Sequence, residues 1–245
     1  MTTEPITVEP ANALEIEAEF DRYGQDYYNL LTHPLRSWTA SSPRFFAIRK
    51  WEVLREALDR LQLDTKNCKW LDVGCGWGEM LRLGQSHFRE SVGCDLSQNM
   101  LAQARGVHVV LQYAPDALPF RDRSFDLVTT VCVYHHVLCA VWRRSLLDET
   151  KRVLKPGGIA CIIEHNPLNP VTRLIVSQTS LDAGARLMRS RETSQLMSSA
   201  GLRVVDKNFF LFLPEKLHNR FPSVERCLKR FPLGGQYAIF AEKRA

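Results

Sequence analysis

The chain lacks the features that mark membrane-spanning and secreted proteins. No apolar run among its 245 residues reaches the roughly 18 residues that a membrane-spanning helix needs. The first ten residues contain Glu4 and Glu9, and no basic segment followed by an apolar one, so they do not read as a secretory signal. These absences predict a cytoplasmic protein without a transmembrane segment.

Cysteine is present, but without the spacing of a redox motif or a zinc site. The seven cysteines stand at positions 68, 75, 94, 132, 139, 161 and 227, and no two of them form C-x-x-C. No group of Cys and His residues has the spacing of a zinc ligand set. We therefore expect reduced, mostly buried thiols and no bound metal ion.

Internal repeats and low-complexity segments are also absent. With 45% hydrophobic and 24% charged residues, the chain suits one globular domain with a small appendage. The net charge of +5 lies in residues 201–245, which hold nine Lys/Arg and four Asp/Glu. This excess suits an anionic substrate or membrane surface, and it is weak support for nucleic acid.

Hydrophobic periodicity predicts two helices followed by alternating strands and helices. The first two helices are expected over residues 11–31, which include three tyrosines, and over 44–61, which carry an apolar stripe. Strands are expected at residues 69–73, 91–95, 107–112, 125–133, 159–164, 202–209 and 237–241. This alternation predicts a doubly wound α/β sheet, with ligands bound at the carboxyl ends of the strands.

A Gly-rich turn follows the first predicted strand directly. Gly74, Gly76 and Gly78 allow positive φ and a close approach of the backbone to a ligand. Asp95 ends the second predicted strand, where a carboxylate can accept both hydroxyls of a ribose. A dinucleotide fingerprint, G-x-G-x-x-G, needs a third glycine where this chain has Glu79. The turn therefore makes a dehydrogenase the least favoured enzyme class.

Together with four later segments, this turn resembles the class I S-adenosylmethionine-dependent methyltransferases of the ubiquinone/menaquinone-methylase type. The five segments, in order over residues 68–164, are Leu71–Gly78, Gly93–Ser97, Leu118–Phe120, Ser124–Val128 and Arg152–Gly158. The resemblance implies a Rossmann-like seven-stranded sheet whose last strand is antiparallel, and S-adenosylmethionine as cofactor. It also implies an N-terminal helical cap over residues 1–62, a donor-binding domain over 63–245, and a lid-like insertion at 209–234.

The resemblance further implies which residues bind the methyl donor. They are Asp72, Gly74, Cys75, Gly76, Asp95, Leu96, Met100, Ala114, Asp116 and Val131. In this assignment the turn meets the methionine part, Asp72 its amino group and Asp95 the ribose. Ala114 stands where the family often has an acidic residue for the adenine amine, and the nearby Asp116 is the expected substitute.

Histidines and a carboxylate follow the fourth and fifth predicted strands, at the ligand end of the sheet. His135 and His136 are candidate bases, because histidine titrates near neutral pH, and we expect only one of the adjacent pair to face the acceptor. Glu164 is a candidate to orient a histidine or bind a hydroxyl, and His165 is a further candidate base. The alternative interpretation is structural, with these side chains packing on the strands or capping the next helix.

These patterns predict a methyltransferase that acts on a small molecule. A hydroxyl of a sugar or of a lipid-linked glycan is the leading acceptor, because some sugar O-methyltransferases resemble this chain in their His-His segment. Methylation of carbon in a quinone-like molecule, and donor binding without catalysis, remain open. Nucleic acid is disfavoured, since Val133–His136 replaces the Asn/Asp-Pro-Pro-aromatic motif of base-methylating enzymes. The basic, aromatic segment 209–234 also leaves weak peripheral contact with a membrane open.

Overall fold

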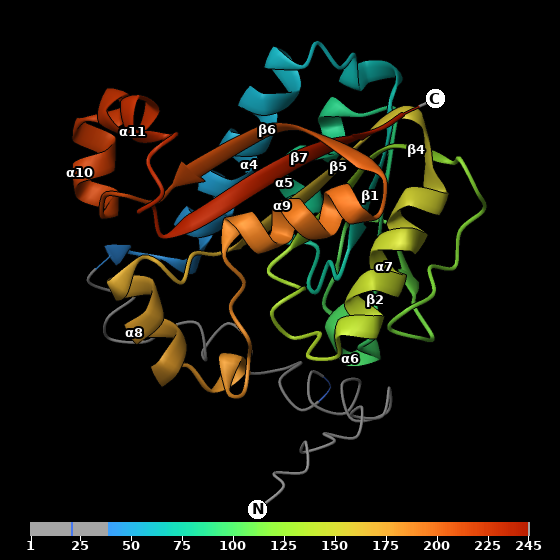
Figure 1. The fold of residues 1–245 in the computed structure, drawn as a ribbon, viewed down its shortest axis with the longest axis horizontal. Coiled ribbons are helices and arrows are strands. Elements are labelled where there is room, and N and C mark those ends of the chain that lie inside the picture. The colour runs from blue at the N-terminus through green and yellow to red at the C-terminus, as the bar shows by residue number, and fades with distance from the viewer. Residues whose placement is uncertain (1–20, 22–38, 245) are drawn as a thin grey trace, which may run out of the picture.

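The computed structural model describes residue 21 and residues 39–244, and a seven-stranded sheet forms its centre (Figure 1). The strand order is β3-β2-β1-β4-β5-β7-β6. Strands β1 to β5 pair in parallel, whereas β7 is antiparallel to both β5 and β6. The strands are β1 (Lys69–Val73), β2 (Glu90–Asp95), β3 (Val109–Leu111), β4 (Phe125–Val131), β5 (Leu154–His165), β6 (Leu202–Phe210) and β7 (Gln236–Lys243). The predicted sheet with an antiparallel last strand is confirmed.

Helices cover both faces of this sheet. One apolar cluster joins α7 and α9 to the strands, and a second joins α4 and α5 to the opposite face. Figure 1 shows α9 and α7 in front of the strands and α4 behind them. The helices are α4 (Pro43–Arg60), α5 (Glu79–Gly84), α6 (Gln98–Ala102), α7 (Ala140–Val153), α8 (Pro170–Gln178), α9 (Ser190–Ser199), α10 (Glu215–Arg220) and α11 (Pro222–Leu228), with short 3-10 helices η1 (Thr65–Asn67), η2 (Gln85–His87) and η3 (Ser180–Asp182). Cover on both sides explains why five of the seven residues of β4 are buried.

Helix α4 packs directly on the sheet. Ser42 caps its first turn and Pro43 occupies the first helical position, as helix starts favour. Trp51 of α4 stacks on Trp70 of β1 with ring centroids 6.0 Å apart. The predicted domain boundary between residues 62 and 63 therefore comes just after α4, a helix whose buried side chains pack in the same core as those of the sheet.

Of residues 1–38, the part of the expected N-terminal cap that precedes α4, the structure describes one residue, Asp21. The carboxylate of Asp21 accepts hydrogen bonds from the Ser97 hydroxyl, at 2.5 Å, and from the Asn99 N–H, at 3.1 Å. It thus lies at the start of α6. The rest of the helix predicted over 11–31, with its tyrosines at 23, 27 and 28, lies outside the described residues.

Two strand boundaries differ from the prediction for clear backbone reasons. β4 ends at Val131 instead of Val133, because Cys132 has a φ of +58° and takes the chain out of the extended conformation. β5 begins at Leu154, five residues early, because Leu154 pairs with Phe125 across a register shift. Among the described residues, no helix has the length and apolar character needed to cross a membrane.

Candidate functional site

The Gly-rich turn follows β1 in a conformation that requires glycine. Gly74 and Gly76 have φ of +67° and +51°. A Cβ atom added to Gly74 would lie 2.5 Å from the Val133 side chain, closer than van der Waals contact permits. The N–H groups of Gly74 and Cys75 both donate to the Cys94 carbonyl, at 2.8 and 3.0 Å. These bonds fix the turn against the end of β2.

Asp95 lies at the end of β2, beside that turn. One carboxylate oxygen accepts a hydrogen bond from the Gly76 N–H at 2.8 Å, and the other accepts one from the Ser97 N–H at 2.9 Å. Burial raises the pKa of Asp95, and these backbone N–H groups oppose that shift. A carboxylate has about four acceptor positions, so both oxygens retain capacity for the two hydroxyls of a ribose.

Asp72 is buried beneath the same turn. Its Oδ1 accepts a hydrogen bond of 2.5 Å from the Thr129 hydroxyl, which in turn accepts one from the Trp70 indole. Burial raises the pKa of Asp72 to about 7, with a smaller contribution from nearby Asp95. A bound ammonium group would favour the ionised carboxylate, which suits the role expected for Asp72.

The adenine end of the site differs from the expectation. Leu96 and Met100 line the cavity as expected, but neither Ala114 nor Asp116 is among its described lining residues. Ala114 forms an isolated bridge with Ala117, and of this short turn Pro115 is the residue that lines the cavity. Gln112 lines the cavity in their place, and the sequence reasoning missed it. Its position as the last residue of the third predicted strand was the available signal.

One cavity of about 470 Å³ contains both the donor residues and the predicted catalytic histidines. Asp72, Gly74, Cys75, Gly76, Asp95, Leu96, Met100 and Val131 line it, as do His135, His136 and His165. Its volume lies within the range of about 300–1,000 Å³ that small-molecule sites have. The Gly74 cradle, the Asp95 acceptors and this volume fit S-adenosylmethionine.

The cavity also has walls from segments distant in the sequence. Phe45, Phe46 and Lys50 of α4 line it on one side. Phe212, next to α10 and within the predicted insertion 209–234, lines it as well. The insertion therefore contributes to the site wall, whereas its Phe221 and Phe231 are exposed.

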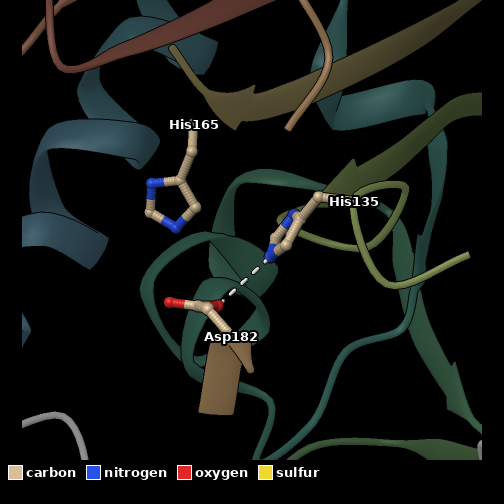
Figure 2. Close-up of side chains that lie close together, drawn as sticks. All are labelled: His135, His165 and Asp182. Carbon is tan, nitrogen blue, oxygen red and sulfur yellow. Dashed lines mark hydrogen bonds and ion pairs between the residues drawn. The ribbon is translucent and has the colours of Figure 1, made fainter. Parts of the chain in front are cut away.

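His135 is fully buried between two carboxylates. Its Nδ1 lies 2.6 Å from Glu164 Oε2, and its Nε2 lies 3.4 Å from Asp182 Oδ1, as Figure 2 shows for the second pair. Burial lowers the pKa of His135, but Glu164 and Asp182 outweigh it and raise the pKa to about 10. The ring is thus a cation at neutral pH. Glu164 in turn accepts the N–H groups of Val133 and Tyr134, at 3.0 and 2.7 Å.

His136 has the opposite electrostatic environment. Burial, together with the smaller effect of the adjacent His135, lowers its pKa to about 3. Its Nε2 lies 3.7 Å from Asp182 Oδ1, and its side chain is 15% exposed. The two rings have centroids 4.0 Å apart and both line the cavity. Both rings border the cavity because the chain has left the strand before it reaches them, and the expectation that one of the pair faces the acceptor stays a prediction.

His165, at the end of β5, completes the group. Its Nδ1 lies 3.3 Å from the Gln236 amide nitrogen, and its ring centroid is 5.3 Å from that of His135. All four predicted catalytic residues therefore lie together. Asp182, in η3, was missed by the sequence reasoning, because nothing in its local sequence places it beside residues 17 and 47 positions earlier.

A protein-family model described as "Methyltransferase domain" matches residues 71–162 of this chain. A tRNA (carboxymethyluridine(34)-5-O)-methyltransferase of Arabidopsis thaliana is 31% identical over 152 residues, which are 60% of this chain and 36% of that protein. The chain thus matches about a third of this relative's length. An uncharacterized methyltransferase of Synechocystis is also 31% identical over 152 residues, 58% of this chain and 70% of that protein.

A solved structure supports the fold. It is a methyltransferase from Thermotoga maritima, described as a possible histamine N-methyltransferase. The TM-score is 0.67 at 18% identity, with 94% of this chain and 100% of that chain covered. Such a low identity supports the fold and no particular substrate. With the family match, the Synechocystis relative and the donor turn, the chain belongs to the class I S-adenosylmethionine-dependent methyltransferases, and S-adenosylmethionine is its cofactor.

Proposed function

We propose that this protein transfers a methyl group to a hydroxyl of a small molecule, with a sugar or a lipid-linked glycan as the leading acceptor. The observation that carries the proposal is the shared cavity, in which the donor turn and a histidine–carboxylate cluster both have access to one space. An amine in its neutral form is already a good nucleophile, so it depends less on a neighbouring base than a hydroxyl does. A hydroxyl is a poor nucleophile while it is protonated, so a base beside it is useful.

When bound, S-adenosylmethionine supplies a methyl group whose bond to sulfur breaks as the bond to the acceptor oxygen forms, and sulfur keeps the electron pair. The chain's residues then have two tasks, which are to align the acceptor and to receive its proton. Alignment within the cavity gives the in-line approach that this displacement needs.

His136 is the residue that we assign to the proton. Its low pKa keeps the ring neutral at pH 7, which is the protonation state that a general base needs. A weak base suffices here, because the acceptor oxygen becomes strongly acidic as its bond to carbon forms. His135 cannot serve, since it already holds a proton between two carboxylates. Glu164 and His135 are positioning residues in this assignment, and His165 is the alternative base.

The Arabidopsis relative supports oxygen as the methylated atom, since its name places the methyl group on oxygen of a tRNA carboxymethyluridine. That name also makes tRNA the main competing acceptor. Carbon methylation of a quinone-like ring is a second competitor, and donor binding without turnover is the non-catalytic one.

The test is methyl transfer from donor labelled in its methyl group, with sugars, lipid-linked glycans, quinones and bulk tRNA offered separately. We expect label in a hydroxyl-bearing small molecule, and His136→Ala to lower turnover about 100-fold or more while donor affinity stays the same. His108→Ala, an exposed histidine outside the cavity, is the matched control. Label found in tRNA, or on a quinone carbon, would overturn the assignment of the acceptor. Full turnover of His136→Ala would remove that residue from the mechanism.

A further inference from the structure

Three side chains from separate parts of the chain point at one small space. His135 follows β4, His165 ends β5 and Asp182 ends η3, and one ligand-capable atom from each lies within 4.8 Å of the other two. Figure 2 shows the two rings and the carboxylate turned toward one another. We propose that these three side chains bind one divalent transition-metal ion of the Zn²⁺ or Fe²⁺ class. The proposal departs from the expectation, drawn from cysteine and histidine spacing, that no metal is bound.

The distances fit such an ion. Two ligands held about 2.1 Å from a metal ion at a tetrahedral angle lie about 3.4 Å apart. The Nε2 of His135 and Oδ1 of Asp182 are 3.4 Å apart. The third ligand atom, from His165, lies at most 4.8 Å from the other two. It therefore needs to move inward by at most about 1.4 Å to reach the spacing of 3.4 Å. The half-buried His165 borders the open cavity, so its ring has room for that movement.

The hydrogen bonds around His135 prepare one nitrogen for a cation. In the neutral tautomer that has its hydrogen on Nδ1, this N–H donates a hydrogen bond to Glu164 Oε2, which lies 2.6 Å from Nδ1. The lone pair of Nε2 then faces an oxygen of Asp182, which is unfavourable unless a positive charge lies between them. A bound metal ion would supply that positive charge between the two atoms, which lie 3.4 Å apart. A carboxylate that accepts the second N–H of a metal-binding histidine is the usual support for such a ligand.

Ligand chemistry selects the class of ion. Two imidazoles and one carboxylate suit zinc and iron, whereas magnesium and calcium prefer sites made of oxygen alone. Three protein ligands also leave at least one coordination position open. Because all three side chains line the donor cavity, that open position faces it.

An acceptor oxygen bound there would lose its proton more readily and would be held beside the donor. This use of the ion rests on the proposed function, whereas the binding of the ion does not. The test therefore measures metal binding in the absence of donor and acceptor, so that a failure of either proposal can be recognised separately.

The experiment titrates the full chain, stripped of metal with a chelator, with Co²⁺ and then with Zn²⁺. We expect one equivalent of Co²⁺ with visible absorption bands of a four- or five-coordinate ion and no thiolate-to-cobalt charge-transfer band. Zn²⁺ should displace the Co²⁺. Thiolate absorption would place the ion at cysteines instead, and no stoichiometric binding of either ion would overturn the proposal.

Variants locate the ion. His165→Ala and Asp182→Asn should each weaken Co²⁺ binding at least tenfold, and Glu164→Gln, which alters the support of His135 without removing a ligand, should weaken it about 10- to 100-fold. His108→Ala should bind as the wild type does. Thermal unfolding of each metal-free variant checks its fold. His165 is half-buried, whereas His135 and Asp182 are buried, so His165→Ala is the decisive variant if a buried one fails to fold. Unchanged binding in folded His165→Ala would refute the site.

Discussion

Replacing Asp72 with asparagine should stabilise the protein at alkaline pH, although it removes a residue of the donor site. Burial raises the pKa of Asp72 from 3.8 to about 7. The unfolded chain therefore releases this proton near pH 4 and the folded chain near pH 7. Between those values the unfolded state binds fewer protons, so wild-type stability falls as pH rises. Asparagine has no proton to release, and this loss disappears in the variant.

The magnitude follows from the size of the shift. Each pKa unit corresponds to about 1.4 kcal/mol, so the buried charge of Asp72 costs about 4 kcal/mol above pH 7. About 3 kcal/mol of that cost develops between pH 5 and pH 8. The added amide N–H group of asparagine needs a partner, which subtracts an amount that does not depend on pH. The difference between the two pH values therefore isolates the effect of the charge.

The assay is denaturant or thermal unfolding of wild type and Asp72→Asn at pH 5 and pH 8. We expect the stability of the variant relative to wild type to increase by about 3 kcal/mol between them, or about 6–12 °C in melting temperature. Asp59→Asn, at an exposed position of α4, should show no such change. A difference that stays constant or shrinks as pH rises would refute the account of Asp72.

The same group ties donor binding to pH. The ionised carboxylate pairs with the ammonium group of the donor, so wild-type affinity for S-adenosylmethionine should rise from pH 6 to pH 8 as Asp72 loses its proton. Asp72→Asn should bind the donor at least tenfold more weakly and lose this dependence. Calorimetry at the two pH values measures both, and equal pH dependence in variant and wild type would contradict the assignment.

Three other perturbations have definite outcomes. Gly74→Ala places a methyl group 2.5 Å from Val133 at a φ of +67°, so we expect destabilisation by about 2 kcal/mol or more and loss of donor binding, measured by unfolding and calorimetry. Arg49→Met leaves the buried carboxylate of Glu225 without the guanidinium that lies 2.7 Å away, which should cost about 3 kcal/mol in denaturant unfolding. Cys227 is the exposed one of the seven free cysteines, so a thiol reagent should label it first in the native protein, and equally fast labelling of a buried thiol would count against the packing described.

The donor half of the site was predictable because its determinants are local in sequence. The turn from Gly74 to Gly78 follows its strand without interruption, and Asp95 ends the neighbouring parallel strand, so the topology brings them together. Strand periodicity also predicted all seven strands, whereas the antiparallel direction of β7 came from the resemblance to the methyltransferases. The adenine end was less predictable, because the small bridge between Ala114 and Ala117 depends on a turn that has no periodicity.

The acceptor half depends on tertiary structure. The sequence pointed to His135 and Glu164 as separate candidates, and their 2.6 Å contact arises because β4 and β5 are adjacent and end at the same edge. The position of Asp182 is set by the path of the chain after α8, which follows no repeating pattern. The left-handed φ of Cys132 could not be predicted from the sequence either. It ends the strand just before His135 and His136, which both line the cavity.

The two halves of the cavity have complementary electrostatics. Near the donor turn, Asp72 and Asp95 provide negative charge for a ligand whose ammonium and sulfonium groups are positive. Transfer of the methyl group makes the sulfur neutral, so this end binds the product less strongly than the donor. At the other end, Glu164 and Asp182 enclose one cation beside His135, either a proton or the proposed metal ion. Under the proposed function, that cation would lie beside the acceptor oxygen and would stabilise the negative charge that the oxygen gains as its proton leaves.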